Sequence, residues 1–186
     1  MTKIDYITIA QQVFKREGKA VSRLSDTLDA EAFNAVVQAI TKCRAGGGRI
    51  ITTGRGNSGA VARKIAHSLC CVDVPSFFQT PGEGFHASTG LIQPGDLLIG
   101  VSRGGDSGDV IELMKMAKQK KAKVVAVTAN PTSTMALIAD IMLRVPIDRD
   151  IDIHDYLDTC SMLAMIAVFD AVALALQPGD GDAQHP

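Results

Sequence analysis

Short, continuously apolar runs alternate with helical segments along most of this chain, and this pattern constrains the fold more than any other feature. The runs cover residues 49–53, 74–78, 97–101, 123–127 and 141–145, and helical spacing fills residues 58–71, 108–118, 134–140 and 157–176. Strands that are apolar at every position are typical of a parallel sheet covered by helices on both faces. The pattern therefore predicts an α/β fold: a doubly wound, five-stranded parallel sheet flanked by helices, in a flavodoxin-like three-layer sandwich.

The residues before the first apolar run follow a helical period and end at a run of three glycines, which predicts a pair of N-terminal helices. No Pro/Ser-rich linker divides the chain, and its 186 residues are a usual length for one domain. We therefore expect a single domain over residues 1–186, made of a helical pair at about 3–45, an α/β core at about 48–176 and a polar tail at 178–186.

Composition and charge exclude several classes of protein. Lys plus Arg number 19 and Asp plus Glu number 20, so no basic excess is present to neutralise a nucleic-acid backbone. The most apolar stretch, residues 162–176, is shorter than the ~20 residues that a membrane span needs and contains Asp170. The N-terminus lacks a signal-peptide pattern, and the four cysteines form no C-x-x-C pair or zinc-type cluster. We expect a reduced, cytoplasmic protein with no metal and no nucleic-acid or membrane partner.

Two junctions between an expected strand and an expected helix share one pattern. Residues 56–61 read Gly-Asn-Ser-Gly-Ala-Val, and residues 105–110 read Gly-Asp-Ser-Gly-Asp-Val. In a parallel sheet both would lie at the carboxyl ends of strands, where such folds bind ligands. Glycine lets backbone N–H groups approach a ligand, and a helix N-terminus attracts oxyanions. The repeat favours phosphate binding over the alternative that Ser58 and Ser107 only cap their helices. For the turn at residues 130–133, capping is the favoured interpretation.

Residues 54–59 also match the dinucleotide fingerprint G-x-G-x-x-G. That fingerprint requires an acidic residue at the end of the next strand to hold the ribose, and residues 78–80 read Phe-Gln-Thr. No Gly-Lys-Ser/Thr follows the glycines, so the pattern of a nucleotide P-loop is absent as well. A dinucleotide oxidoreductase is therefore disfavoured, and no organic cofactor is expected.

The first loop, the segment Pro81-Gly82-Glu83-x-x-His86 and the loop Ser102-x-x-Gly105-Asp106-Ser107 together resemble the SIS (sugar isomerase) domain family over about residues 30–176. The chain is most similar to the arabinose 5-phosphate isomerase group of the KpsF and GutQ type, without CBS modules. It has Asn57 where that group usually has lysine, and Gly104 where the group usually has serine. The resemblance implies a sugar-phosphate aldose–ketose isomerase that forms dimers or tetramers, with sites near the subunit interfaces.

The resemblance also implies which residues form the site. Substrate and phosphate would be bound by the two loops, through Gly56, Asn57, Ser58, Gly59, Ser102, Arg103, Gly105, Asp106 and Ser107. Aldose–ketose isomerisation through an enediol needs a base beside the carbonyl and an acid that moves protons between the oxygens. Glu83 is the expected base, in a Pro-Gly-rich turn, and His86 is the expected acid–base partner. His154, in the acidic run before the last helix, is a third catalytic candidate.

The sequence is compatible with other interpretations. Glu83 could be a surface carboxylate, His86 a structural hydrogen-bonding residue, and residues 148–155 a solvated run. The chain could instead be a 6-phospho-3-hexuloisomerase, although the Pro-Gly-Glu-x-x-His segment argues against it. It could also be a sugar-phosphate sensor without catalysis, although the first 45 residues are not basic and so do not suggest a DNA-binding module.

Overall fold

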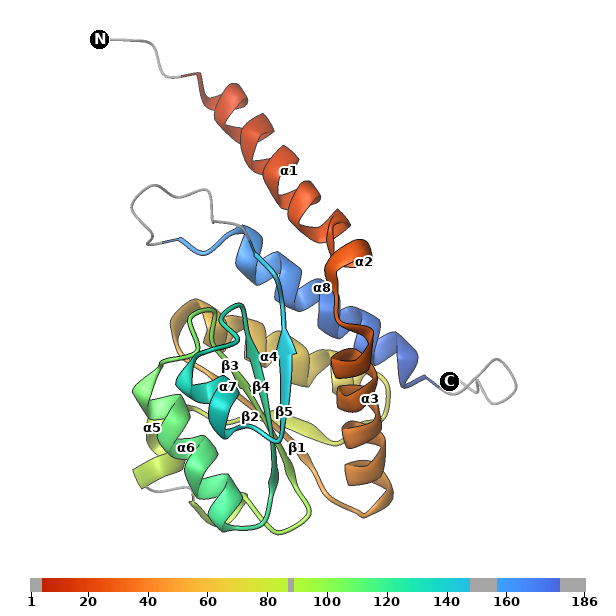
Figure 1. Ribbon diagram of the computed structural model, residues 1–186, viewed down its shortest axis with the longest axis vertical. Coiled ribbons are helices and arrows are strands. Elements are labelled where there is room, and N and C mark those ends of the chain that lie inside the picture. Colours follow the sequence, from red (N-terminus) through yellow and green to blue (C-terminus); the bar gives the residue numbers. More distant parts are fainter. Residues whose placement is uncertain (1–4, 87–88, 148–156, 178–186) are drawn as a thin grey trace.

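The computed structural model describes residues 5–86, 89–147 and 157–177, and its centre is a five-stranded sheet (Figure 1). All strand pairs are parallel, in the order β2-β1-β3-β4-β5. The strands are β1 (Ile50–Gly54), β2 (Ser76–Phe78), β3 (Leu97–Val101), β4 (Lys123–Thr128) and β5 (Ile141–Arg144). The predicted fold class is confirmed, and the strand order is the flavodoxin-like one.

Helices cover both faces of the sheet and make two separate apolar cores. One core lies between the sheet and α3, α4 and α8, and the other between the sheet and α6 and α7. Alternate residues of β1, β3 and β4 enter different cores, as Leu97 and Leu98 of β3 do. The helices are α1 (Tyr6–Ser22), α2 (Leu24–Thr27), α3 (Ala30–Ala45), α4 (Gly56–Cys70), α5 (Pro81–His86), α6 (Gly108–Gln119), α7 (Thr134–Ile138) and α8 (Cys160–Ala175), with a 3₁₀ turn at Thr89–Leu91.

Several boundaries differ from those expected. The Pro-Gly-rich segment after β2, expected as a turn, forms α5, whose first residue is Pro81. Proline suits the first position of a helix because its fixed φ is already helical and its missing N–H would have no partner there. Helix α4 begins at Gly56, two residues before Ser58, and the N-terminal pair is interrupted by the short α2.

An ion pair joins the beginnings of β1 and β3. The Arg49 guanidinium lies 2.8 Å from the carboxylate of Asp96, which is almost fully buried. Asp96 also accepts hydrogen bonds from the backbone N–H groups of Arg49 and Gln93. Burial alone would raise the pKa of Asp96, but the hydrogen bond from the Arg49 side chain, together with those from the two backbone N–H groups, outweighs burial and holds the pKa below its ordinary value. The pair stabilises the end of the sheet at which β1 and β3 begin.

Helix α1 lies outside the three layers. It packs against α8 and projects away from the sheet (Figure 1). None of its residues is buried, and several large apolar side chains on it are exposed. Within the ranges that the structure describes, no helix is both long enough and apolar enough to cross a membrane.

Candidate active site

Two loops lie side by side at the carboxyl ends of β1 and β3. The strands are paired so that Gly54 is opposite Val101, and both therefore end at the same level. The chain leaves β1 toward β2 on one side and leaves β3 toward β4 on the other. This is the topological switch point, where open α/β sheets bind ligands. We call residues 55–59 the first loop and residues 102–107 the second loop.

The second loop holds two serine hydroxyls next to each other. The Oγ atoms of Ser102 and Ser107 are 3.1 Å apart, and the backbone N–H of Gly105 donates to Ser102 Oγ over 3.1 Å. Ser107 occupies the N-cap position of α6, but its side chain makes no capping hydrogen bond. Capping therefore does not explain Ser107, which stands at the start of α6, where the first N–H groups of a helix have no partner within the helix.

Gly105 is required where it stands. Its φ is +76°, in the region that favours glycine. A Cβ atom there would collide with the side chain of Ser133 and lie 2.9 Å from Oγ1 of Thr128. The carbonyl of Gly105 accepts the N–H of Met135, so the loop is attached to α7. Ser133 itself caps α7 by accepting the N–H of Ala136, as the capping interpretation of that turn predicts.

The first loop becomes helical earlier than the sequence suggests. Arg55 is the N-cap of α4, so Ser58 lies inside the first turn and does not cap the helix. The helix packs closely on the strand end at two glycines: a Cβ at Gly54 would lie 2.7 Å from the Ser58 carbonyl oxygen, and one at Gly59 would lie 2.8 Å from the Gly54 carbonyl oxygen. This close packing places the N-terminus of α4 directly at the end of β1.

A cavity of about 430 Å³ opens beside the first loop. Its wall comes from β1, α4, the end of β2, α5 and the first turn of α6: Gly54, Arg55, Gly56, Gly59, Ala60, Arg63, Phe78, Thr80, Pro81, Gly82 and Asp109. Two of the expected binding residues, Gly56 and Gly59, line it directly. The cavity is large enough for the carbon chain of a small phosphorylated metabolite.

Two interactions in this wall involve side chains that were not among the expected site residues. Arg55 and Asp109 form an ion pair of 3.7 Å that connects the first loop to α6. The guanidinium of Arg63 stacks on the ring of Phe78, 3.8 Å from its centroid. Asp109 lies within the repeated Gly-x-Ser-Gly-x-Val pattern, so the pattern could have indicated it as a site residue. No sequence pattern near Arg63 or Phe78 predicts their contact, because it joins two separate elements, α4 and the end of β2.

The charged residues of the second loop, Arg103 and Asp106, bind other segments of the chain. Arg103 forms an ion pair of 3.5 Å with Asp158, which precedes α8. Asp106 accepts the backbone N–H of Thr134 over 2.9 Å. That backbone hydrogen bond, followed by one from the Thr134 side chain, holds the pKa of Asp106 below its ordinary value. Both residues therefore tie the loop to neighbouring segments.

Two of the three expected catalytic residues lie on one helix, α5. Glu83 is exposed on α5, whose first two residues, Pro81 and Gly82, line the cavity. His86 is the last residue of the same helix. His154 lies outside the described residues. Among the described residues, no group of three or more His, Cys, Asp or Glu side chains is arranged to hold a metal ion.

Comparison with known proteins adds a family and several relatives. The model of the SIS domain matches residues 45–175. The arabinose 5-phosphate isomerase KpsF of Escherichia coli is 33% identical over 186 residues, which are 97% of this chain and 58% of the relative. The chain thus spans little more than half the length of this curated relative.

Two solved structures superpose closely on this one. A protein from Listeria monocytogenes has a TM-score of 0.88 and 36% sequence identity, and the match covers 95% of this chain and 91% of that chain. A protein from Escherichia coli CFT073, solved in complex with arabinose 5-phosphate, has a TM-score of 0.86 and 27% identity, with 95% and 92% of the two chains covered.

Proposed function

This chain belongs to the SIS domain family, and from that membership we propose that it is a sugar-phosphate aldose–ketose isomerase that works through an enediol, with arabinose 5-phosphate as its substrate. The identity of the sugar rests on the relatives, since KpsF is an arabinose 5-phosphate isomerase and the Escherichia coli CFT073 protein was solved with the same sugar phosphate. The proposed substrate class is also supported by the geometry of the strand ends.

The observation that carries the proposal is the pair of loops at the switch point. Ser102 and Ser107 present adjacent hydroxyls, and α4 and α6 both begin there, so their free N–H groups and partial positive charges favour a phosphate. The cavity beside the first loop would then take the carbon chain of the sugar. In this arrangement Ser58 would contact phosphate from the first loop, with Asn57 beside it.

Glu83 and His86 are the residues we propose for proton transfer. Helix α5 lies at the cavity, so the Glu83 carboxylate can act as the base that takes the proton from the carbon beside the carbonyl. His86 would move protons between the two oxygens of the enediol. Asp109, held by Arg55, is placed to accept a hydrogen bond from a sugar hydroxyl. His154 remains a candidate for the same chemistry.

Proton exchange tests the reaction directly. The protein is incubated in heavy water with arabinose 5-phosphate, and NMR follows deuterium entering beside the carbonyl. We expect exchange with the wild type and a decrease of about a hundredfold for His86→Ala, the size usual for loss of a general acid–base group. His67→Ala, in an exposed position on α4, is the matched control and should retain the rate.

Either of two outcomes would contradict this proposal. Exchange with a hexulose 6-phosphate and not with arabinose 5-phosphate would support the isomerase reaction but contradict the proposed substrate. Binding of sugar phosphates without exchange would identify a non-catalytic sensor. An undiminished rate in His86→Ala would remove the role of that residue alone.

We also propose that the protein is a cytoplasmic homo-oligomer, a dimer or a tetramer, with sites near the subunit interfaces. Free thiols at all four cysteines are compatible with a reducing compartment. On α1, Tyr6, Ile7 and Phe14 are 76%, 64% and 69% exposed, which is unusual for such large apolar side chains. A second copy of this chain is the occupant that would cover them.

Sedimentation tests the assembly. We expect the wild type to sediment as an oligomer and Ile7→Lys/Phe14→Lys to sediment as a smaller species, because two charges would be buried in the contact. The matched control is Thr8→Lys/Gln12→Lys, two polar, exposed positions on a different face of the same helix. A monomeric wild type would contradict the proposal.

A further inference from the structure

The proposed mechanism leaves one arginine of the cavity wall without a role. On the α4 side, the cavity beside the first loop is lined by Gly56, Gly59, Ala60 and Arg63. Residues three, four and seven positions apart share one face of a helix, so these four residues form the face of α4 that borders the cavity. Two glycines and an alanine offer almost no side chain. Arg63 is therefore the side chain by which this face of α4 can reach a ligand.

The Arg63 guanidinium is held in place by Phe78, at the end of β2. Its central carbon lies 3.8 Å from the centroid of the Phe78 ring. At this distance the planar guanidinium has to lie parallel to the ring, because an N–H pointing at the ring would bring its nitrogen inside van der Waals contact. The N–H groups therefore point away from the ring, in the plane of the guanidinium. A cation fixed in this way is suited to stabilising charge that develops during a reaction.

The position of Arg63 along α4 matches the length of a pentose phosphate. Arg63 follows Gly56 by seven residues, which is about 10 Å along the helix, and helical side chains lean back toward the N-terminus. Three bonds of an extended chain span about 3.5 Å, so the six bonds from phosphorus to the carbonyl carbon of a pentose 5-phosphate span about 7 Å. With the phosphate at the N-terminus of α4, the carbonyl end would therefore lie at the guanidinium.

We propose that Arg63 is a catalytic residue that binds the carbonyl oxygen and stabilises the enediolate, a role that rests on the proposed function. When the base removes the proton beside the carbonyl, the electron pair of that C–H bond forms a carbon–carbon double bond, and the carbonyl π pair moves onto oxygen. The N–H groups of Arg63 donate to this oxyanion. Return of the proton to the former carbonyl carbon, with a proton moved between the oxygens, completes the isomerisation. Because arginine stays protonated, Arg63 holds the charge while His86 moves the protons.

Two substrate analogues and deuterium exchange together test this role. The compound 4-phospho-D-erythronohydroxamate has two adjacent oxygens like an enediolate, whereas arabinitol 5-phosphate has an alcohol in place of the carbonyl. Arg63→Met keeps the length of the side chain and its contact with Phe78. We expect it to slow exchange with arabinose 5-phosphate about a hundredfold and to weaken hydroxamate binding, measured by calorimetry, by a similar factor. The affinity for arabinitol 5-phosphate should fall by about tenfold or less, because its hydroxyl carries no charge.

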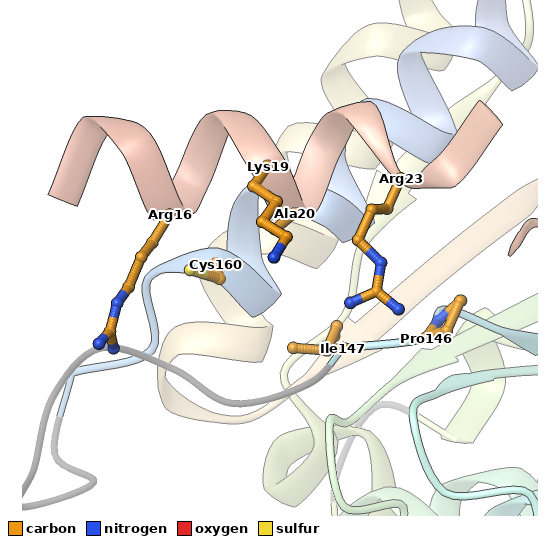
Figure 2. Close-up of a pocket in the computed structure, with 7 residues that line it drawn as sticks. All are labelled: Arg16, Lys19, Ala20, Arg23, Pro146, Ile147 and Cys160. Carbon is orange, nitrogen blue, oxygen red and sulfur yellow. The ribbon is translucent and has the colours of Figure 1, made fainter. Parts of the chain in front are cut away.

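Arg16→Met is the matched control. Arg16 is an exposed arginine on α1 that lines a different cavity, of about 220 Å³, between α1, the segment after β5 and the start of α8 (Figure 2). This variant removes the same charge away from the two loops. Its exchange rate and its affinities for both analogues should stay at the wild-type values.

Three results would each overturn the role of Arg63: an undiminished exchange rate in Arg63→Met, an equal loss of affinity for the two analogues, or the same losses in Arg16→Met. An equal loss for the two analogues would mean that Arg63 binds the alcohol and the enediolate mimic alike. The proposed function is tested by the wild type alone. A wild type that exchanges no deuterium would contradict the isomerase itself, whereas an active wild type with an equally active Arg63→Met would contradict only the role of Arg63.

Discussion

The double variant Ser102→Ala/Ser107→Ala is expected to lower kcat/KM for the sugar phosphate by about a thousandfold. Each hydroxyl would lose a hydrogen bond to a charged phosphate, and such bonds contribute about 1.5–3 kcal/mol. Because the two Oγ atoms are 3.1 Å apart, one phosphate can contact both. Ser102 is also buried, so its removal leaves the N–H of Gly105 without its side-chain acceptor and loosens the loop.

Steady-state kinetics and calorimetric titration of the sugar phosphate measure this effect. The matched control is Ser22→Ala/Ser25→Ala, which removes two exposed hydroxyls at the junction of α1 and α2. The control should keep the kcat/KM of the wild type. Unchanged affinity in the Ser102→Ala/Ser107→Ala protein, at an unchanged melting temperature, would show that phosphate does not bind at the second loop.

Gly105→Ala should lower the free energy of unfolding by about 3 kcal/mol and reduce substrate affinity as well. A left-handed φ costs a non-glycine residue about 1–2 kcal/mol, and forcing an extra methyl group into a packed site costs about 1–3 kcal/mol. Here the methyl group would collide with Ser133, whose hydroxyl caps α7. Relief of the collision would move the second loop away from the position that lets Ser102 and Ser107 act together.

Gly104→Ala is the matched control for this prediction. Gly104 is the neighbouring residue, it has no positive φ, and a Cβ there would meet no atom within 4 Å. In urea unfolding, Gly105→Ala should therefore be less stable than Gly104→Ala by most of the loss in unfolding free energy expected for Gly105→Ala. Equal stability of the two proteins would mean that the loop adapts to the methyl group and that its conformation does not depend on glycine.

The fold class could be predicted because the three central strands, β1, β3 and β4, are buried on both faces. Residues 97–101 are apolar throughout and form β3 with the expected bounds. The segment at residues 81–86 was missed as a helix because its two glycines and its proline are typical of turns. Tertiary packing against α6 outweighs the low helix propensity of those glycines.

The candidate site could be predicted only in part, because some of its contacts join residues that are far apart in the sequence. The repeated pattern located both loops and their serines because glycine and serine at strand ends are local signals. The partners of charged residues are not local: Arg103 pairs with Asp158, and Arg63 stacks on Phe78, across different elements. Such contacts follow from the order of the strands and the placing of α8, which no short stretch of sequence encodes.

The ion pair between Arg103 and Asp158 attaches the second loop to the segment that leads into α8. The same loop carries Ser102 and Ser107, so a sugar phosphate that holds the loop in place would also hold this ion pair. Thermodynamic linkage makes such coupling reciprocal: whatever factor a shift of the segment before α8 imposes on sugar-phosphate affinity, bound sugar phosphate imposes on the equilibrium of that shift.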